Sequence, residues 1–171
     1  NFDIDHLDTI KSILSGNELL YRVKNVEGIL VQSALIDKTL IEACPNLKVI
    51  CNVGVGFDNI DANFCTKMGI QVTNTPGILN DAVADMSMAL LLAVARRVPE
   101  GDRIVRSGGF KSNFYHLLWG ADLRGENLGI IGMGSIGQDV AKRAIPFGLN
   151  IKYHNRNRLS KNIESSLNGE W

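Results

Sequence analysis

An α/β fold made of parallel, open sheets is the fold class that the sequence predicts, and three observations predict it. Short apolar runs of strand type alternate with helical runs along the chain, which is typical of parallel sheets. A break at Thr75-Pro76-Gly77 divides this alternation into two parts. In the second part, the sequence G-x-G-x-x-G at 132–137 follows an apolar run at 127–131 and precedes a helical run.

The first part of the chain, residues 1–75, is predicted to form an open, flavodoxin-like sheet. Apolar residues at helical spacing predict a helix over 4–14. Three strand runs and two helical runs follow in alternation: strands at 27–31, 47–51 and 70–73, and helices at 38–43 and 61–68. Gly54 and Gly56 predict a tight turn directly beyond the second strand.

The second part, from residue 76 onward, is predicted to open with a long helix over 81–97. This helix is apolar nearly all round, as expected of a helix buried between two layers. A polar connector leads to a strand near residue 128, and a further strand is expected at 151–154 after the intervening helix. Residues 159–171 are polar and predict no third strand. A mononucleotide-binding half needs three strands, so the second part is expected to be incomplete at its C-terminal end.

The glycine-rich turn lies in the strand-turn-helix context that a dinucleotide-binding fingerprint requires. Gly132 allows a sharp turn off the strand, Gly134 allows the backbone to approach a pyrophosphate, and Gly137 allows close packing of helix on strand. The pyrophosphate is expected at the positive N-terminal end of that helix. The sequence therefore predicts that residues 76–171 are a partial Rossmann domain that binds a dinucleotide.

The choice of dinucleotide depends on the residues at the end of the second strand of that domain. NAD-specific sites place an acidic residue there, about 20 positions past the glycines, to bind the ribose 2′-hydroxyl. Here the sequence is His154-Asn155-Arg156-Asn157-Arg158, with two guanidinium groups and no carboxylate. Guanidinium groups suit a 2′-phosphate, which favours NADP over NAD. The alternative is that both arginines belong to a solvated surface loop.

Composition excludes several classes of function. Lys plus Arg equals Asp plus Glu, at 18 each, so the chain lacks the charge expected for binding nucleic acid or an anionic membrane. The longest apolar stretch, within 82–95, is too short and too interrupted to span a bilayer, and the first residues do not form a signal peptide. Cys44, Cys51 and Cys65 form no C-x-x-C pair, which favours reduced, packed thiols in the cytoplasm over metal ligation.

Four sequence blocks occur in a characteristic order between residues 27 and 158. They are 52–61, 74–77 with 83–85, 123–125 with the glycine turn, and 153–156. With these blocks the chain resembles the D-isomer-specific 2-hydroxyacid dehydrogenases, and it is most similar to their glyoxylate and hydroxypyruvate reductase branch. Asp85 stands where that family usually has glutamate, so the carboxylate is kept.

The resemblance implies reduction of a small 2-keto acid to a 2-hydroxy acid by hydride transfer from NAD(P)H. It implies that the backbone of Val55 and Gly56 binds the substrate carboxylate. The implied cofactor-binding residues are Gly132, Gly134, Ser135, Ile136, Gly137, Asn155, Arg156 and Arg158. It further implies a homodimer associated through the cofactor domain and its long helix.

No residue is assigned a catalytic role. The family's catalytic arginine, glutamate and histidine come after the second cofactor strand, and no match to them precedes Trp171. His6, His116 and His154 do not fit the position of the general acid. We therefore expect the 171-residue chain by itself to be a truncated and inactive form of the enzyme.

Two other functions are compatible with the same fold. One is a nucleotide-binding regulatory protein, similar to the corepressors that share this scaffold, because fold alone does not determine function. The other is a related dehydrogenase that acts on formate or phosphoglycerate. Residues 51–58 contain no basic side chain for a phosphate group, and formate enzymes usually prefer NAD, so both substrates are disfavoured.

Overall fold

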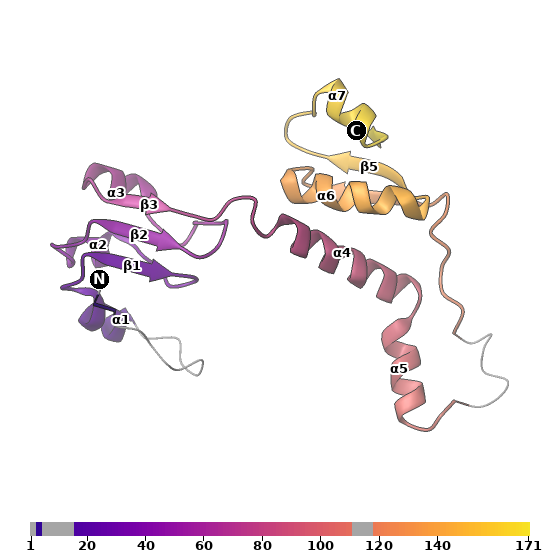
Figure 1. Ribbon diagram of the computed structural model, residues 1–171, viewed down its shortest axis with the longest axis horizontal. Helices are drawn as coiled ribbons and strands as arrows, with labels where there is room; N and C mark the ends of the chain where they lie inside the picture. The colour runs from indigo at the N-terminus through magenta and orange to yellow at the C-terminus, as the bar shows by residue number, and fades with distance from the viewer. Residues whose placement is uncertain (1–2, 5–15, 111–117) are drawn as a thin grey trace. The chain divides into compact units, whose positions relative to one another are not determined.

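The computed structural model describes residues 3–4, 16–110 and 118–171, which form two compact units. The N-terminal unit is Asn1–Pro76 and the C-terminal unit is Gly77–Trp171. Each unit contains one three-stranded sheet in which all strands are parallel. Figure 1 shows the parallel strands of the N-terminal unit. The predicted α/β class with two parallel, open sheets is therefore confirmed.

In the N-terminal unit, helices and strands alternate and the strands pair in chain order, β1-β2-β3. The elements are α1 (Gly16–Val23), β1 (Gly28–Val31), α2 (Lys38–Glu42), β2 (Val49–Asn52), α3 (Ala62–Lys67) and β3 (Gln71–Thr73). Ile50 of the central strand is fully buried and pairs with Ile29 on one side and Val72 on the other. Asp37 and Asp61 cap α2 and α3, each accepting a backbone N–H at 2.9 Å.

Helix α1 differs from what the sequence predicts at the start of the chain. The expected helix over 4–14 lies mostly outside the described residues. The structure has instead a helix over Gly16–Val23, which the sequence reasoning did not identify. Leu19 and Val23, one turn apart, pack against the buried core of the unit. Two apolar anchors in eight residues are too few for periodicity to predict a helix.

In the C-terminal unit, two helices precede a second alternation of strands and helices. The elements are α4 (Asn80–Ala95), α5 (Val98–Arg106), β4 (Asn127–Ile131), α6 (Ser135–Ala144), a 3₁₀ turn η2 (Ile145–Phe147), β5 (Asn150–His154), α7 (Lys161–Ser166) and β6 (Gly169–Glu170). The strand order is β4-β5-β6. Helix α6 lies along α4 (Figure 1), and the wholly buried Ala84, Ala141 and Ala144 belong to these two helices.

The end of the chain forms a third strand, so the expectation that residues 159–171 contain none is wrong. Strand β6 pairs in parallel with β5, with Ile151 opposite Gly169 and Lys152 opposite Glu170. With it, the unit has the β-α-β-α-β order of one mononucleotide-binding half. A strand of two residues is too short to show an alternating pattern, which is why the sequence did not reveal it.

The polar connector after α4 begins with a helix that was not predicted. Arg97 adopts a left-handed conformation (φ 55°) and separates α4 from α5. Pro99 lies in the first turn of α5, where its missing N–H carries no cost. Bidentate hydrogen bonds from Arg97 to Glu100, both 2.7 Å, stabilise this start.

Helix α4 is less buried than its sequence predicts. Only Ala84 and Met88 are buried, on the side that packs along α6. Apolar residues on other positions of the helix are exposed in the structure: Val83, Met86, Leu90 and Val94. Within the C-terminal unit, α4 is therefore covered on one face and not between two layers. Over the described residues, no helix is both long and apolar enough to cross a membrane.

Candidate functional site

One candidate site is the loop at residues 53–56 of the N-terminal unit, directly after β2. Asn52, the last residue of β2, is 2% exposed and turns its side-chain amide beneath this loop. Its Nδ2 donates to the backbone oxygens of Gly54 (3.0 Å) and Gly56 (2.6 Å). These two bonds draw both carbonyl groups toward the protein interior.

Residues at the end of the N-terminal unit hold the other carbonyl groups of this loop. The Thr75 hydroxyl donates to the oxygen of Val53, and Asn74 Nδ2 donates to the oxygen of Val55, both at 2.8 Å. The backbone N–H of Thr75 is a second donor to Gly54, at 3.3 Å. All four carbonyl oxygens of residues 53–56 are therefore satisfied by groups of the protein itself.

With its carbonyl groups held, the loop is left with unpaired backbone donors. Among the described residues, the N–H groups of Gly54, Val55 and Gly56 donate no hydrogen bond. Successive free N–H groups in a turn form a concave site for an anion. Val55 and Gly56 belong to this loop, and their role in binding a substrate carboxylate stays a prediction. Sequence reasoning missed the residues that arrange them, Asn52, Asn74 and Thr75, because no motif relates a polar strand end to a polar segment twenty residues later.

A second candidate site, in the C-terminal unit, is the glycine-rich turn after β4. Gly132 has φ +98°, and its N–H donates to the His154 oxygen (2.9 Å), which ties the turn to the end of β5. A Cβ on Gly137 would lie 2.4 Å from the Gly132 oxygen, so the start of α6 can approach the strand only with glycine there. A Cβ on Gly134 would meet nothing within 4 Å. The turn is closed on its inner side and open at Gly134.

The open side of this turn is the N-terminus of α6. In the part of the chain that the structure describes, the N–H groups of Gly134, Ser135 and Ile136 have no acceptor. Unpaired N–H groups and the helix dipole together favour a phosphate or pyrophosphate group. The open space at Gly134 and these donors fit the pyrophosphate of a dinucleotide.

Asn155 takes part in the turn itself. Its Oδ1 accepts the Met133 N–H at 2.7 Å, and its Nδ2 lies 3.5 Å from the Met133 oxygen. Gln138 of α6 donates to the same oxygen at 3.3 Å. The residue that follows β5 therefore holds the middle of the glycine turn in place.

The two arginines after β5 have different surroundings. Arg156 is exposed, and within the described residues its guanidinium has neither an ion pair nor a hydrogen bond. Arg158 forms a bidentate pair with Glu164, with its Nε 2.8 Å from Oε1 and its Nη2 3.0 Å from Oε2. Of these two arginines, only Arg156 has a guanidinium without a partner among the described residues.

Glu164 is a nearly buried carboxylate at 8% exposure, and Tyr153 also donates to it, at 2.5 Å. The hydrogen bonds from Arg158 and Tyr153 hold the pKa of Glu164 below its ordinary value of 4.5. Burial, and then the neighbouring Glu164 carboxylate, raises the pKa of Tyr153. The carboxylate is therefore ionised at neutral pH and matched by the Arg158 cation.

Asp85, the position that differs from the family's usual glutamate, is part of an ion-pair cluster between α4 and α6. Arg143 of α6 places its Nε 2.6 Å from Asp85 and its Nη2 2.8 Å from Asp81. The hydrogen bonds that Arg143 donates to these two carboxylates, Asp81 first, raise the pKa of Arg143. The Asp85 carboxylate thus connects the long helix to the helix of the glycine turn.

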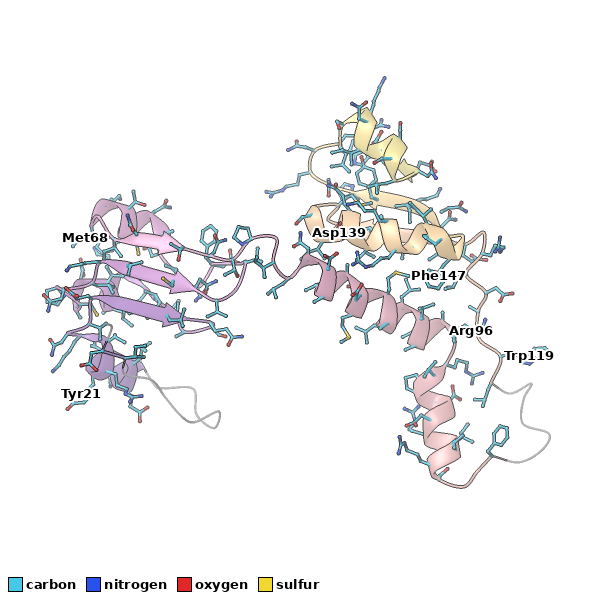
Figure 2. The ribbon with its side chains drawn as sticks, viewed as in Figure 1. Tyr21, Met68, Arg96, Trp119, Asp139 and Phe147 are labelled. Atoms are coloured by element: carbon cyan, nitrogen blue, oxygen red, sulfur yellow. The ribbon has the colours of Figure 1, made fainter. Side chains whose placement is uncertain are left out.

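The C-terminal unit also contains a hollow near the other end of β4 from the glycine turn. A hollow of about 530 Å³ is lined by Leu92, Arg96, Asp122, Leu123, Arg124 and Phe147. It adjoins the residues that precede β4, whereas the glycine turn follows β4; Arg96 and Phe147 are labelled in Figure 2. His154 ends β5, and His6 and His116 lie outside the described residues. Among the residues that the structure describes, no cluster of His, Cys, Asp and Glu is suited to a metal ion.

Comparison with known proteins agrees with this geometry. Residues 3–165 match the family model of the D-isomer specific 2-hydroxyacid dehydrogenase, catalytic domain. The chain belongs to this family. A glyoxylate reductase of Pyrococcus horikoshii is 48% identical over 158 residues, which are 90% of this chain and 47% of that protein. The chain therefore spans about half the length of the curated relatives it matches.

Solved structures share the fold of the chain. The TT0316 protein from Thermus thermophilus has a TM-score of 0.83 at 45% identity, over 86% of this chain and 48% of that one. A D-lactate dehydrogenase from Aquifex aeolicus, complexed with NAD and lactic acid, has a TM-score of 0.75 at 28% identity, over 85% of this chain and 43% of that one. An acyclic imino acid reductase in complex with NADPH and D-Arg has a TM-score of 0.76 at 30% identity, over 86% and 48%.

Proposed function

We propose that the protein to which this chain belongs is an NADPH-dependent reductase of small 2-keto acids, with glyoxylate or hydroxypyruvate as substrate. The observation that carries the proposal is the pair of unpaired donor sets, one after β2 and one after β4. One set suits a carboxylate and the other a pyrophosphate. The similarity to glyoxylate reductases supports this choice of substrate.

In this proposal, the N–H groups of Gly54, Val55 and Gly56 bind the substrate carboxylate. Asn52, Asn74 and Thr75 prepare the loop by holding its carbonyl groups inward. Because the N–H donors are already oriented, the loop loses little conformational entropy when an anion binds. Because this loop carries no charged donor, it suits a single carboxylate better than a phosphate.

The cofactor is proposed to bind along the carboxyl ends of β4 and β5. Gly134, Ser135 and Ile136 receive the pyrophosphate, and Gly132, Gly137 and Asn155 shape the turn. Arg156 receives the 2′-phosphate, which makes NADP the preferred cofactor and NAD the alternative. Bound NADPH would supply the hydride.

Two further properties belong to the proposal. We infer a homodimer that associates through α4, supported by the exposed apolar Val83, Met86, Leu90 and Val94 on that helix. We also infer a cytoplasmic location, supported by the buried, unpaired thiols of Cys44 and Cys65. Burial raises the pKa of both thiols and keeps them protonated and unreactive.

The direct test is a two-dimensional NMR titration of the 15N-labelled chain. Glyoxylate should shift the amide signals of Gly54, Val55 and Gly56, and NADP⁺ should shift those of Gly134, Ser135 and Ile136. Glycolaldehyde, which lacks the carboxylate, serves as the control and should leave the three loop signals in place at the same concentration. The proposal fails if glyoxylate leaves the three loop signals in place at saturating concentration.

The cofactor preference is tested with Arg156→Asp. A carboxylate at this position repels a 2′-phosphate and accepts a ribose hydroxyl, so the ratio of NADP⁺ to NAD⁺ affinity should fall by about tenfold or more. Calorimetric titration of both nucleotides measures the ratio. Arg106→Asp, which makes the same charge change at an exposed position on α5, should leave the ratio unchanged. An unaltered ratio in Arg156→Asp would remove the argument for NADP.

A further inference from the structure

The loop at residues 155–159, between β5 and α7, is attached at both ends. At its start, Asn155 accepts the Met133 N–H and so joins the glycine turn. At its end, the backbone N–H of Leu159 donates to the Tyr153 hydroxyl at 3.1 Å. Arg156 lies between these two attachments.

The second attachment is part of a larger group of side chains, which we call the Glu164 cluster: Tyr153, Arg158, Glu164 and Trp171. Tyr153 comes from β5, Glu164 from α7, and Trp171 follows β6. Tyr153 is 6% exposed and donates to Glu164 while it accepts from Leu159. The Arg158 guanidinium lies 5.5 Å from the centre of the Trp171 ring, within the range of a cation–π contact.

This cluster already engages the Arg158 guanidinium on two sides. Its fork donates twice to Glu164, and the ring of Trp171 lies beneath the guanidinium. Releasing Arg158 toward a phosphate would leave the nearly buried Glu164 carboxylate without its cation, which is costly. Arg156, two residues earlier, has no such partner among the described residues. The two arginines are therefore not equivalent, although the sequence presents them alike.

We propose that Tyr153, Arg158 and Glu164 are positioning residues that fix the loop 155–159, and that Arg156 is the one arginine of the pair that contacts the 2′-phosphate. The inference rests on the proposed cofactor site and deepens it. A fixed loop keeps Asn155 on the glycine turn and Arg156 beside the ribose. Loss of the cluster should therefore weaken the binding of every nucleotide that contacts the glycine turn, whether or not it carries a 2′-phosphate.

The test compares two ligands by calorimetry on the 171-residue chain: ADP, and ADP that carries an additional 2′-phosphate. Arg156→Ala should weaken the 2′-phosphorylated ligand about tenfold and leave ADP unchanged, because it removes one charge-assisted contact. Arg158→Ala, Glu164→Gln and Tyr153→Phe should each weaken both ligands. The 2′-phosphorylated ligand should lose at least as much affinity as ADP, because the loop that the cluster fixes also carries Arg156.

A double variant distinguishes positioning from direct contact. If Arg158 and Glu164 act as one unit, Arg158→Ala with Glu164→Gln should weaken ADP no more than the stronger single change does. Tyr153→Phe keeps the ring in place and removes only the hydroxyl, so it remains informative if the other variants unfold. Circular dichroism at the titration temperature confirms that each variant is folded.

Each outcome has a separate meaning. The inference is overturned if Arg158→Ala weakens only the 2′-phosphorylated ligand, or if Arg156→Ala and Arg158→Ala have the same pattern. It is also overturned if Glu164→Gln and Tyr153→Phe leave both affinities unchanged. If the wild-type chain binds ADP and its 2′-phosphorylated form with the same affinity, the proposed NADP preference fails. In that case, a loss of ADP binding in all three cluster variants still supports the positioning role.

Discussion

The loop after β2 and the turn after β4 present free backbone N–H groups by two different physical means. The turn after β4 relies on glycine and on a helix, because Gly132 adopts a positive φ, Gly137 permits close approach, and α6 supplies the donors. The loop after β2 has no helix at its donors. Side chains of Asn52, Asn74 and Thr75 hold its carbonyl oxygens instead, and the N–H groups remain.

This difference determines what each region tolerates. The turn depends on the absence of side-chain atoms, so an added methyl group is its most damaging change. The loop depends on the amide and hydroxyl groups of particular side chains, so truncation of one of these side chains is its most damaging change. The glycines of the turn can therefore be recognised from a motif, whereas the side chains that hold the loop are recognised only when their hydrogen bonds are seen.

The largest effect is expected for Gly137→Ala. The new Cβ would lie 2.4 Å from the backbone oxygen of Gly132, and α6 must move away from β4. Overpacking of this kind costs about 1–3 kcal/mol, and thermal unfolding measures it. Gly134→Ala is the matched control, because its Cβ meets nothing within 4 Å. It should keep the stability and weaken nucleotide binding; equal melting temperatures for Gly137→Ala and the wild type would contradict the packing argument.

A smaller effect is expected for Asn52→Ala, which removes both hydrogen bonds from the loop carbonyls. The free energy of unfolding should fall by about 1 kcal/mol, as is usual for lost hydrogen bonds. The loss is moderate because Asn52 Oδ1 is buried without a partner among the described residues, and the variant removes that unsatisfied atom as well. Glyoxylate-induced shifts of the Val55 and Gly56 amide signals should decrease.

The control for this change is Asn59→Ala. Asn59 also holds a backbone oxygen in the N-terminal unit, that of Ala34, at 2.9 Å. It should lose comparable stability and keep the response of the loop to glyoxylate. If both variants reduce the response equally, the loop is affected by general loosening and not by its own hydrogen bonds.

The smallest expected effect is a dependence of stability on pH. It concerns only the region of the glycine turn and not the loop after β2. The side chains that hold the loop after β2 do not ionise, whereas the segment that supports the turn depends on Glu164. Because the pKa of Glu164 is lowered by folding, its contribution to stability is complete above 4.5 and is lost as the pH falls through the lowered value. The difference in melting temperature between wild type and Glu164→Gln should therefore shrink in acid. A difference independent of pH would contradict this.

Much of the fold and part of the site follow from sequence pattern. Strand runs and the glycine fingerprint predicted β1 to β5 and the turn, because apolar periodicity and glycine have local causes. Local pattern did not predict α1, α5 or β6. Helix α1 is held by two residues against the core, and β6 is a two-residue strand defined by its partner β5. The exposed side of α4 was misjudged because apolar composition predicts burial and cannot say which neighbour provides it.

The sequence by itself determined the α/β class, the glycine turn and the presence of two arginines at the end of β5, since each depends on residue type and spacing along the chain. Only the tertiary structure decided that Arg158 is paired with Glu164 and that Arg156 is not. It also decided that Asn52, Asn74 and Thr75 act on one loop. Hydrogen bonds between distant segments depend on how the sheet brings strand ends together, and spacing in the sequence does not encode that contact directly.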